Sequence, residues 1–175
     1  MIPTEDQAKK LWDKYGLPEG KRRHVEFVAK VAKYLAANLK INEKLLIAGA
    51  LLHDIDKNVT KLSGEKHPDA GVRILREEGM GEVAALVKTH PLHAILDPAI
   101  TPKTWEEKLL FLADKMVKQD VIGVDARFRL WNDEHLPSEQ QKILDAAYPK
   151  VKELEKETFD LIGTDQKRIL EETKG

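Results

Sequence analysis

Apolar residues recur at steps of three and four positions along most of this chain, which is the spacing of amphipathic helices. The clearest example runs from Lys21 to Leu39. Its expected buried face carries Val25, Val28, Ala29, Ala32, Leu35, Ala36 and Leu39. We find no alternating strand pattern of useful length and no internal repeat, so the pattern predicts an all-α fold.

Capping residues and helix breakers predict where these helices begin and end. Thr4 and Gln7 form a capping box before a first helix at 6–15, which Gly16 ends. Further helices are expected after Asn42, at 67–78 and 82–89, from 101 onward, and at 138–161 with a kink or break at Pro149. Residues 121–134 show no clear period, and the chain ends in a charged tail. We therefore expect roughly seven to nine helices in a single domain over 1–175, with helical extensions at 1–20 and 136–175.

One segment is apolar on every side. From Leu45 to Leu52 no polar side chain occurs, which indicates a central, buried helix rather than a surface one. His53 and Asp54 follow directly. An imidazole and a carboxylate in such a place are costly unless they are paired or bound to a metal ion. This position makes an otherwise uninformative His-Asp dipeptide a candidate site.

Composition restricts the chemistry that such a site could perform. The 29 Lys and Arg residues balance 30 Asp and Glu residues, so no net field attracts nucleic acid or an anionic membrane. The absence of cysteine excludes a thiolate nucleophile and every cysteine-based zinc site. The sequence begins without a signal-peptide pattern, and its longest apolar stretch is too short to span a membrane. We expect a cytoplasmic protein without a membrane partner.

A wider pattern surrounds the dipeptide, with His24 upstream and Asp114 downstream in an expected helix. Three local strings accompany it: Leu51-Leu52-His53-Asp54-Ile55-Asp56-Lys57, His67-Pro68-Asp69-Ala70-Gly71 and Leu110-Phe111-Leu112-Ala113-Asp114-Lys115. This pattern of His and Asp residues and the three strings resemble the HD superfamily of metal-dependent phosphohydrolases over roughly residues 21–120. The resemblance implies a single HD-type helical bundle.

The resemblance also implies a metal site, with ligands His24, His53, Asp54 and Asp114 for one ion. His67 and His90 would complete a second site, and Asp54 would then bridge two ions. Imidazole and carboxylate donors suit Fe, Mn, Co, Ni or Zn, one or two ions per chain. A metal-bound hydroxide would attack phosphorus, so no protein nucleophile is required.

Four further residues are candidate substrate contacts. If the helix continues past His53, Lys57 would face the same cavity, where its ammonium could bind phosphate and assist Asp54 in catalysis. Lys115 and Arg127 could also bind phosphate, although each is more simply interpreted as a solvated charge. His90 and His93 compete for one ligand position beside Pro91; we favour His90 as ligand and His93 as a substrate contact.

These features favour hydrolysis of a small phosphorylated metabolite, with a nucleotide as the preferred class. Asn58 and Val59 stand where stringent-response hydrolases carry a Glu-Asp pair, and the Gly-Tyr-Pro signature of cyclic-dinucleotide phosphodiesterases does not occur. The set of four histidines and two aspartates is most similar to the HD-type diadenosine tetraphosphate hydrolases, although Lys66 precedes His67 where those enzymes have paired histidines. The alternatives are a di-iron oxygenase and a non-catalytic helical module that binds metal or nucleotide. We expect no nucleic-acid polymer as partner, and a homodimer is compatible with the sequence.

Overall fold

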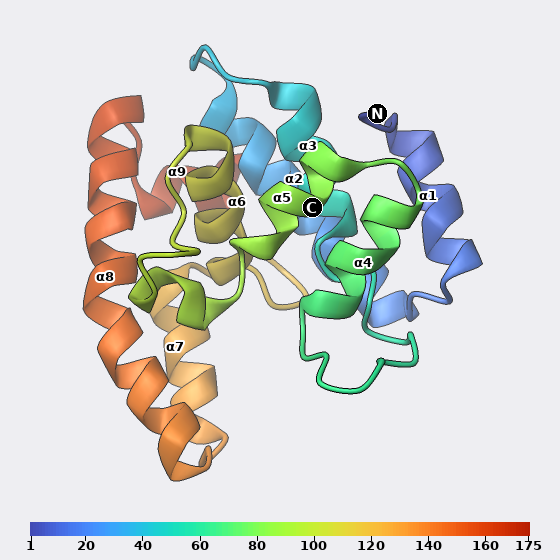
Figure 1. Ribbon diagram of the computed structural model, residues 1–175. Helices are drawn as coiled ribbons and strands as arrows, with labels where there is room; N and C mark the ends of the chain where they lie inside the picture. The colour runs from blue at the N-terminus through green and yellow to red at the C-terminus, as the bar shows by residue number, and fades with distance from the viewer.

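Nine α-helices and one short 3₁₀ helix form the protein, and the computed structural model describes all of residues 1–175 (Figure 1). In chain order they are α1 (Glu5–Lys14), α2 (Glu19–Ala36), α3 (Glu43–Leu52), α4 (Asp69–Glu77), α5 (Gly81–Lys88), η1 (Leu92–Leu96), α6 (Trp105–Lys115), α7 (Val124–Asp133), α8 (Ser138–Ile162) and α9 (Gln166–Glu172). The only strand-like pairing is an isolated bridge between Val117 and Val121. The predicted all-α fold is confirmed.

The apolar helix α3 lies at the centre of the molecule, as its sequence predicts. It packs against α1, α2, α5 and α6, and most of its residues from Leu46 to Leu52 are buried. Helix α6 is the second deeply buried element, with Leu109 to Ala113 fully enclosed. One apolar cluster extends from α1 to α9, while α8 lies along the edge of the molecule opposite α1 (Figure 1). None of the helices is long and apolar enough to span a membrane.

Side-chain caps set several of the helix starts. The Thr4–Gln7 capping box and the Asn42 N-cap are both present, as predicted. A second capping box, formed by Thr104 and Glu107, begins α6 at Trp105. It satisfies the N–H groups of Thr104 and Glu107, and the helix begins a few residues beyond the expected 101–102.

Three features of the second half differ from the sequence-based expectation. The unassigned segment 121–134 contains α7, which buries only Val124 and Phe128 and therefore has little apolar period. The charged tail contains α9, which Asp165 caps and Ile169 anchors in the core. Helix α8 is not split at Pro149, because the exposed proline lies between turns that are held by buried apolar residues on both sides.

Candidate metal centre

Six ionisable side chains from five segments of the chain meet at one end of the central helices. They are His24 on α2, His53 and Asp54 at the end of α3, His67 just before α4, His90 just after α5, and Asp114 near the end of α6. These are the six residues that the sequence analysis singled out as ligands. All but His67 and Asp114 are buried, and those two are partly exposed.

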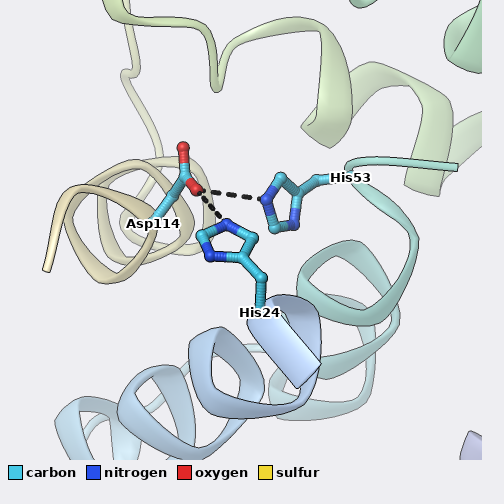
Figure 2. Close-up of side chains that lie close together, drawn as sticks. All are labelled: His24, His53 and Asp114. Atoms are coloured by element: carbon cyan, nitrogen blue, oxygen red, sulfur yellow. Dashed lines mark hydrogen bonds and ion pairs between the residues drawn. The ribbon is translucent and has the colours of Figure 1, made fainter. Parts of the chain in front are cut away.

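The first group of donors surrounds Asp114 (Figure 2). Its Oδ1 lies 2.9 Å from His24 Nε2 and 3.2 Å from His53 Nε2, and both rings point toward it. The Oδ2 of Asp54 approaches the same two nitrogens, at 3.8 Å from His24 and 3.7 Å from His53. Two imidazoles and two carboxylates therefore enclose a common point.

The second group of donors lies on the other side of Asp54. Its Oδ1 is 3.7 Å from His67 Nε2, and that nitrogen is 2.9 Å from His90 Nε2. The two oxygens of Asp54 thus face different histidines, Oδ2 toward His24 and His53 and Oδ1 toward His67. Asp54 therefore lies between the histidines of the two groups.

The Nδ1 atom of each histidine has its own hydrogen-bond acceptor. His24 Nδ1 lies 2.7 Å from the carbonyl of Lys118, His53 Nδ1 lies 2.7 Å from that of Ala50, and His90 Nδ1 bonds to that of Val87. His67 Nδ1 instead meets the carboxylate of Asp56 at 2.8 and 3.0 Å. A carbonyl or carboxylate partner places the proton on Nδ1, so each Nε2 presents a lone pair to the site.

This donor set fits divalent metal ions. Ligand bonds of about 2.1 Å place neighbouring donor atoms about 3 Å apart, close to the shorter distances measured here. Nitrogen and oxygen donors without sulfur suit Mn, Fe, Co, Ni or Zn. The buried His/Asp cluster is thus of the kind that binds metal ions in HD domains.

Electrostatics also favours a cation at this site. Burial by itself would raise the pKa values of Asp54 and Asp114. The nearby charges outweigh burial and lower both pKa values below their ordinary range: His53 and Lys57 act on Asp54, and Lys115 and His53 act on Asp114. Burial opposes a charged His53, yet the two carboxylates raise its pKa overall. Burial and the nearby His53 lower the pKa of His90 well below its ordinary value. Ionised carboxylates and a neutral imidazole are the forms that bind metal.

A cavity of about 410 Å³ opens onto the cluster. His24, Asp54, His67, His90 and Asp114 form its floor. Five cationic side chains also line it, namely Lys21, Lys57, Lys115, Lys118 and Arg127. Although the chain as a whole is nearly neutral, this cavity offers a locally basic environment for an anion.

Three of the predicted substrate contacts, Lys57, Lys115 and Arg127, line this cavity. Helix α3 ends at Leu52, but a tight turn from Asp54 keeps Lys57 near the site, with its Nζ 3.8 Å from Asp54 Oδ1. Arg127 stacks on Trp131, with its guanidinium 4.1 Å from the ring centroid, and its buried Nε has no hydrogen-bond partner. Arg127 as a residue lines the basic cavity, so its guanidinium is placed to attract an anionic ligand there.

Lys115 is more deeply buried than the sequence predicted, and His93 lies outside the cavity. The simpler interpretation of Lys115 as a solvated charge is wrong, because the residue is 2% exposed. Its Nζ donates to Asp114 Oδ2 at 2.6 Å and to the carbonyl of His90 at 2.7 Å, and it lies over the Phe111 ring. His93 is exposed on η1 and does not line the cavity. The structure therefore brings His90, and not His93, to the cluster.

Asp56 is a residue that sequence reasoning missed. It lies two positions after Asp54 in the turn that follows the buried helix, and it is 1% exposed. A second carboxylate so close to the end of an apolar helix is a signal that could have identified it. Only the structure shows that its partner is His67, eleven positions further along the chain.

Comparison with known proteins agrees with this site. The model of the HD domain family matches residues 22–118, which include His24, His53, Asp54 and Asp114. This chain belongs to the HD domain family.

Two curated archaeal proteins resemble nearly the whole chain. A protein of Picrophilus torridus named tRNA (cytidine(56)-2'-O)-methyltransferase is 30% identical over 175 residues, which cover 94% of this chain and 49% of that protein. A protein of the same name from Thermoplasma volcanium is 30% identical over 180 residues, covering 97% of this chain and 51% of the relative. The chain thus spans about half the length of these relatives. No solved structure matches it.

Proposed function

We propose that this protein is a metal-dependent phosphohydrolase that acts on a small phosphorylated substrate, with a nucleotide as the preferred class. The observation that carries the proposal is the orientation of Asp54, whose Oδ2 faces His24 and His53 while its Oδ1 faces His67. A bridging carboxylate between two groups of nitrogen donors suits a pair of ions that together hold one phosphate. The basic lining of the cavity favours the same class of substrate.

Each residue of the site has a distinct role in this proposal. Bound ions would acidify a water molecule and neutralise charge on the phosphate oxygens. Asp54 and the histidines would hold the ions, and the hydrogen bond to each Nδ1 fixes the orientation of its ring. Lys57, on the Oδ1 side of Asp54, binds a phosphate oxygen and stabilises developing charge. Arg127, whose guanidinium lines the cavity, binds a second oxygen.

Metal analysis and phosphate release test this proposal together. Protein purified without added metal is analysed for bound ions, then assayed for phosphate release from a panel of nucleotides with Mn or Fe supplied. We expect one or two ions per chain and release from at least one nucleotide. The Asp54→Asn variant should lose both metal and activity, because Asp54 faces both groups of donors. No release from any substrate would contradict the proposal, and oxygen consumption by the iron-loaded protein would favour an oxygenase instead.

A tRNA-related role is the second candidate, because two relatives named as tRNA methyltransferases match almost the whole chain. We propose that methyl transfer in those relatives belongs to the half that this chain does not span, and that the shared half is an HD domain. This candidate conflicts with our expectation that the protein has no polymeric nucleic-acid partner, and two measurements test that expectation. The measurements are binding of transcribed tRNA at several salt concentrations and transfer of labelled methyl groups from S-adenosylmethionine. Transfer of labelled methyl groups to tRNA by this chain would contradict the assignment of methyl transfer to the other half of the relatives. Tight, salt-dependent binding of tRNA would make tRNA a partner.

A further inference from the structure

His67 is held differently from the other three histidines of the cluster. His24, His53 and His90 are all buried, and each bonds through Nδ1 to a backbone carbonyl. The side chain of His67 is 23% exposed, and it follows the irregular segment 58–66 rather than lying on a helix. Packing alone therefore restricts its ring less than the rings of the others.

The carboxylate of Asp56 supplies the missing restraint. Both of its oxygens lie within 3.0 Å of His67 Nδ1, and the Asp56 side chain is fully buried. No lysine or arginine forms an ion pair with it, and His67 is its only side-chain hydrogen-bond partner. Helix α4 covers the carboxylate closely, since a Cβ added at Gly71 would lie 3.6 Å from Asp56 Cγ. A buried carboxylate is costly without a partner, so this pair is built as a unit.

Such a pair has a specific effect on the opposite nitrogen of the ring. A carboxylate accepts the Nδ1 proton more strongly than a carbonyl does, and it increases the electron density that Nε2 offers to an ion. His67 Nε2 faces His90 Nε2 and Asp54 Oδ1, which are the donors of the second group. None of these contacts involves His24 or Asp114, which belong to the first group.

We propose that Asp56 is a positioning residue that strengthens the binding of the second metal ion. It holds the His67 ring in place through Nδ1, with Nε2 directed at His90 and Asp54, and thereby raises the affinity of the second group of donors without affecting the first. The inference rests on the two-ion site proposed above. It predicts that loss of Asp56 converts a two-ion protein into one that binds a single ion tightly.

Metal titration of single variants tests this inference. Isothermal titration with Co²⁺ and metal analysis after dialysis give the number of ions and both dissociation constants for each protein. For Asp56→Ala we expect the second dissociation constant to rise about 10- to 100-fold, with the first changed by less than about 2-fold. Asp56→Asn should show a smaller rise, because an amide oxygen can still accept the Nδ1 proton but carries no charge. His67→Ala should lose the second ion altogether.

Glu65→Gln is the matched control for the amide variant. Glu65 is a carboxylate of the same irregular segment, but it pairs with Arg73 and does not contact His67. We expect it to bind two ions with wild-type affinities. Circular dichroism in metal-free buffer checks that each variant folds. If Asp56→Ala does not fold, the dissociation constants of Asp56→Asn test the inference.

The outcomes separate this inference from the function on which it rests. Two ions bound with wild-type affinity by both Asp56 variants, together with loss of one ion in His67→Ala, would overturn the inference alone. A single ion in the wild-type protein, unaffected by His67→Ala, would overturn the two-ion site and the inference with it. Selective loss of the second ion in the Asp56 variants would support both.

Discussion

The Nε2 atoms of His67 and His90 lie 2.9 Å apart, although each ring already bonds through Nδ1 to an acceptor. Two ring nitrogens at this distance share either a proton or a metal ion. Metal binding should therefore stabilise the fold, because an ion at this place links segments that are far apart in the sequence.

Adding metal to the metal-free protein should raise its Tm. At a free ion concentration about 100 times the dissociation constant, one site contributes about 2.7 kcal/mol, which for a chain of this size is roughly 5–10 °C. Differential scanning calorimetry with Mn²⁺, and again after addition of a chelator, measures the shift. His90→Ala should show a smaller increase, and a Tm that does not respond to any ion would contradict the site.

Replacing Lys115 by methionine should destabilise the metal-free protein. The buried ammonium bonds to Asp114 and to the carbonyl of His90, so its removal leaves a carboxylate without its charge partner. We expect the free energy of unfolding to fall by about 3 kcal/mol, measured by urea denaturation. Lys118→Met is the control, since that side chain is 48% exposed and should change stability by less than about 0.5 kcal/mol. Equal effects of the two variants would contradict a structural role for Lys115.

Arg127→Ala should weaken substrate binding while leaving the metal content unchanged. Its guanidinium lines the cavity, stacks on Trp131 and contacts none of the ligand side chains. Loss of one charge-assisted hydrogen bond predicts a rise in KM of about 10-fold. Arg129→Ala provides the matched control, because Arg129 is exposed on the same helix and lies outside the cavity. If both variants show the same KM, Arg127 does not bind the phosphate.

Asp125 should make stability depend on pH through the contact between α7 and α8. The hydrogen bond from Tyr148 and the ammonium of Lys152 hold the pKa of Asp125 below its ordinary value. A carboxyl whose pKa is lower in the folded state stabilises the protein above its unfolded pKa of about 3.9. That contribution disappears as the pH falls through the folded pKa.

The Asp125→Asn variant tests this dependence. At pH 7 it should lose about 1 kcal/mol of unfolding free energy, a value reduced for the partial exposure of the pair. The difference from wild type should begin to shrink as the pH falls below the unfolded pKa of about 3.9, and it should vanish below the lower folded pKa, where Asp125 loses its charge. Asp133→Asn, an exposed change on the same helix, serves as control. A difference that stays constant between pH 7 and pH 3 would show that charge at Asp125 does not contribute.

Much of the fold, and the His53-Asp54 pair as a candidate site, could be predicted from the sequence, because both depend on local patterns. The capping boxes and N-caps satisfy N–H groups within a single helical turn, so Thr4 and Asn42 mark helix starts without reference to the rest of the chain. Apolar residues on all sides of 45–52 require a buried helix, and a polar pair at its end requires compensation. His53 and Asp54 were identifiable for that reason.

Features that depend on contacts between distant segments could not be predicted in this way. Helix α7 buries so few residues that its period is faint, and α9 joins the core mainly through Ile169. The burial of Lys115 arises because α6 brings it beneath the carbonyl of His90, a residue 25 positions away. The choice of His90 over His93 depends on the direction in which the chain turns after Pro91.

By itself, the sequence determined which residue types the site contains and which helices carry them. Only the tertiary structure decided how Asp54 divides its two oxygens between histidines, and that Asp56 holds His67. The physical reason is the distance along the sequence over which each interaction acts. Helix periodicity and capping act over a few residues, whereas the direction of a lone pair depends on side chains that folding brings together from five separate segments.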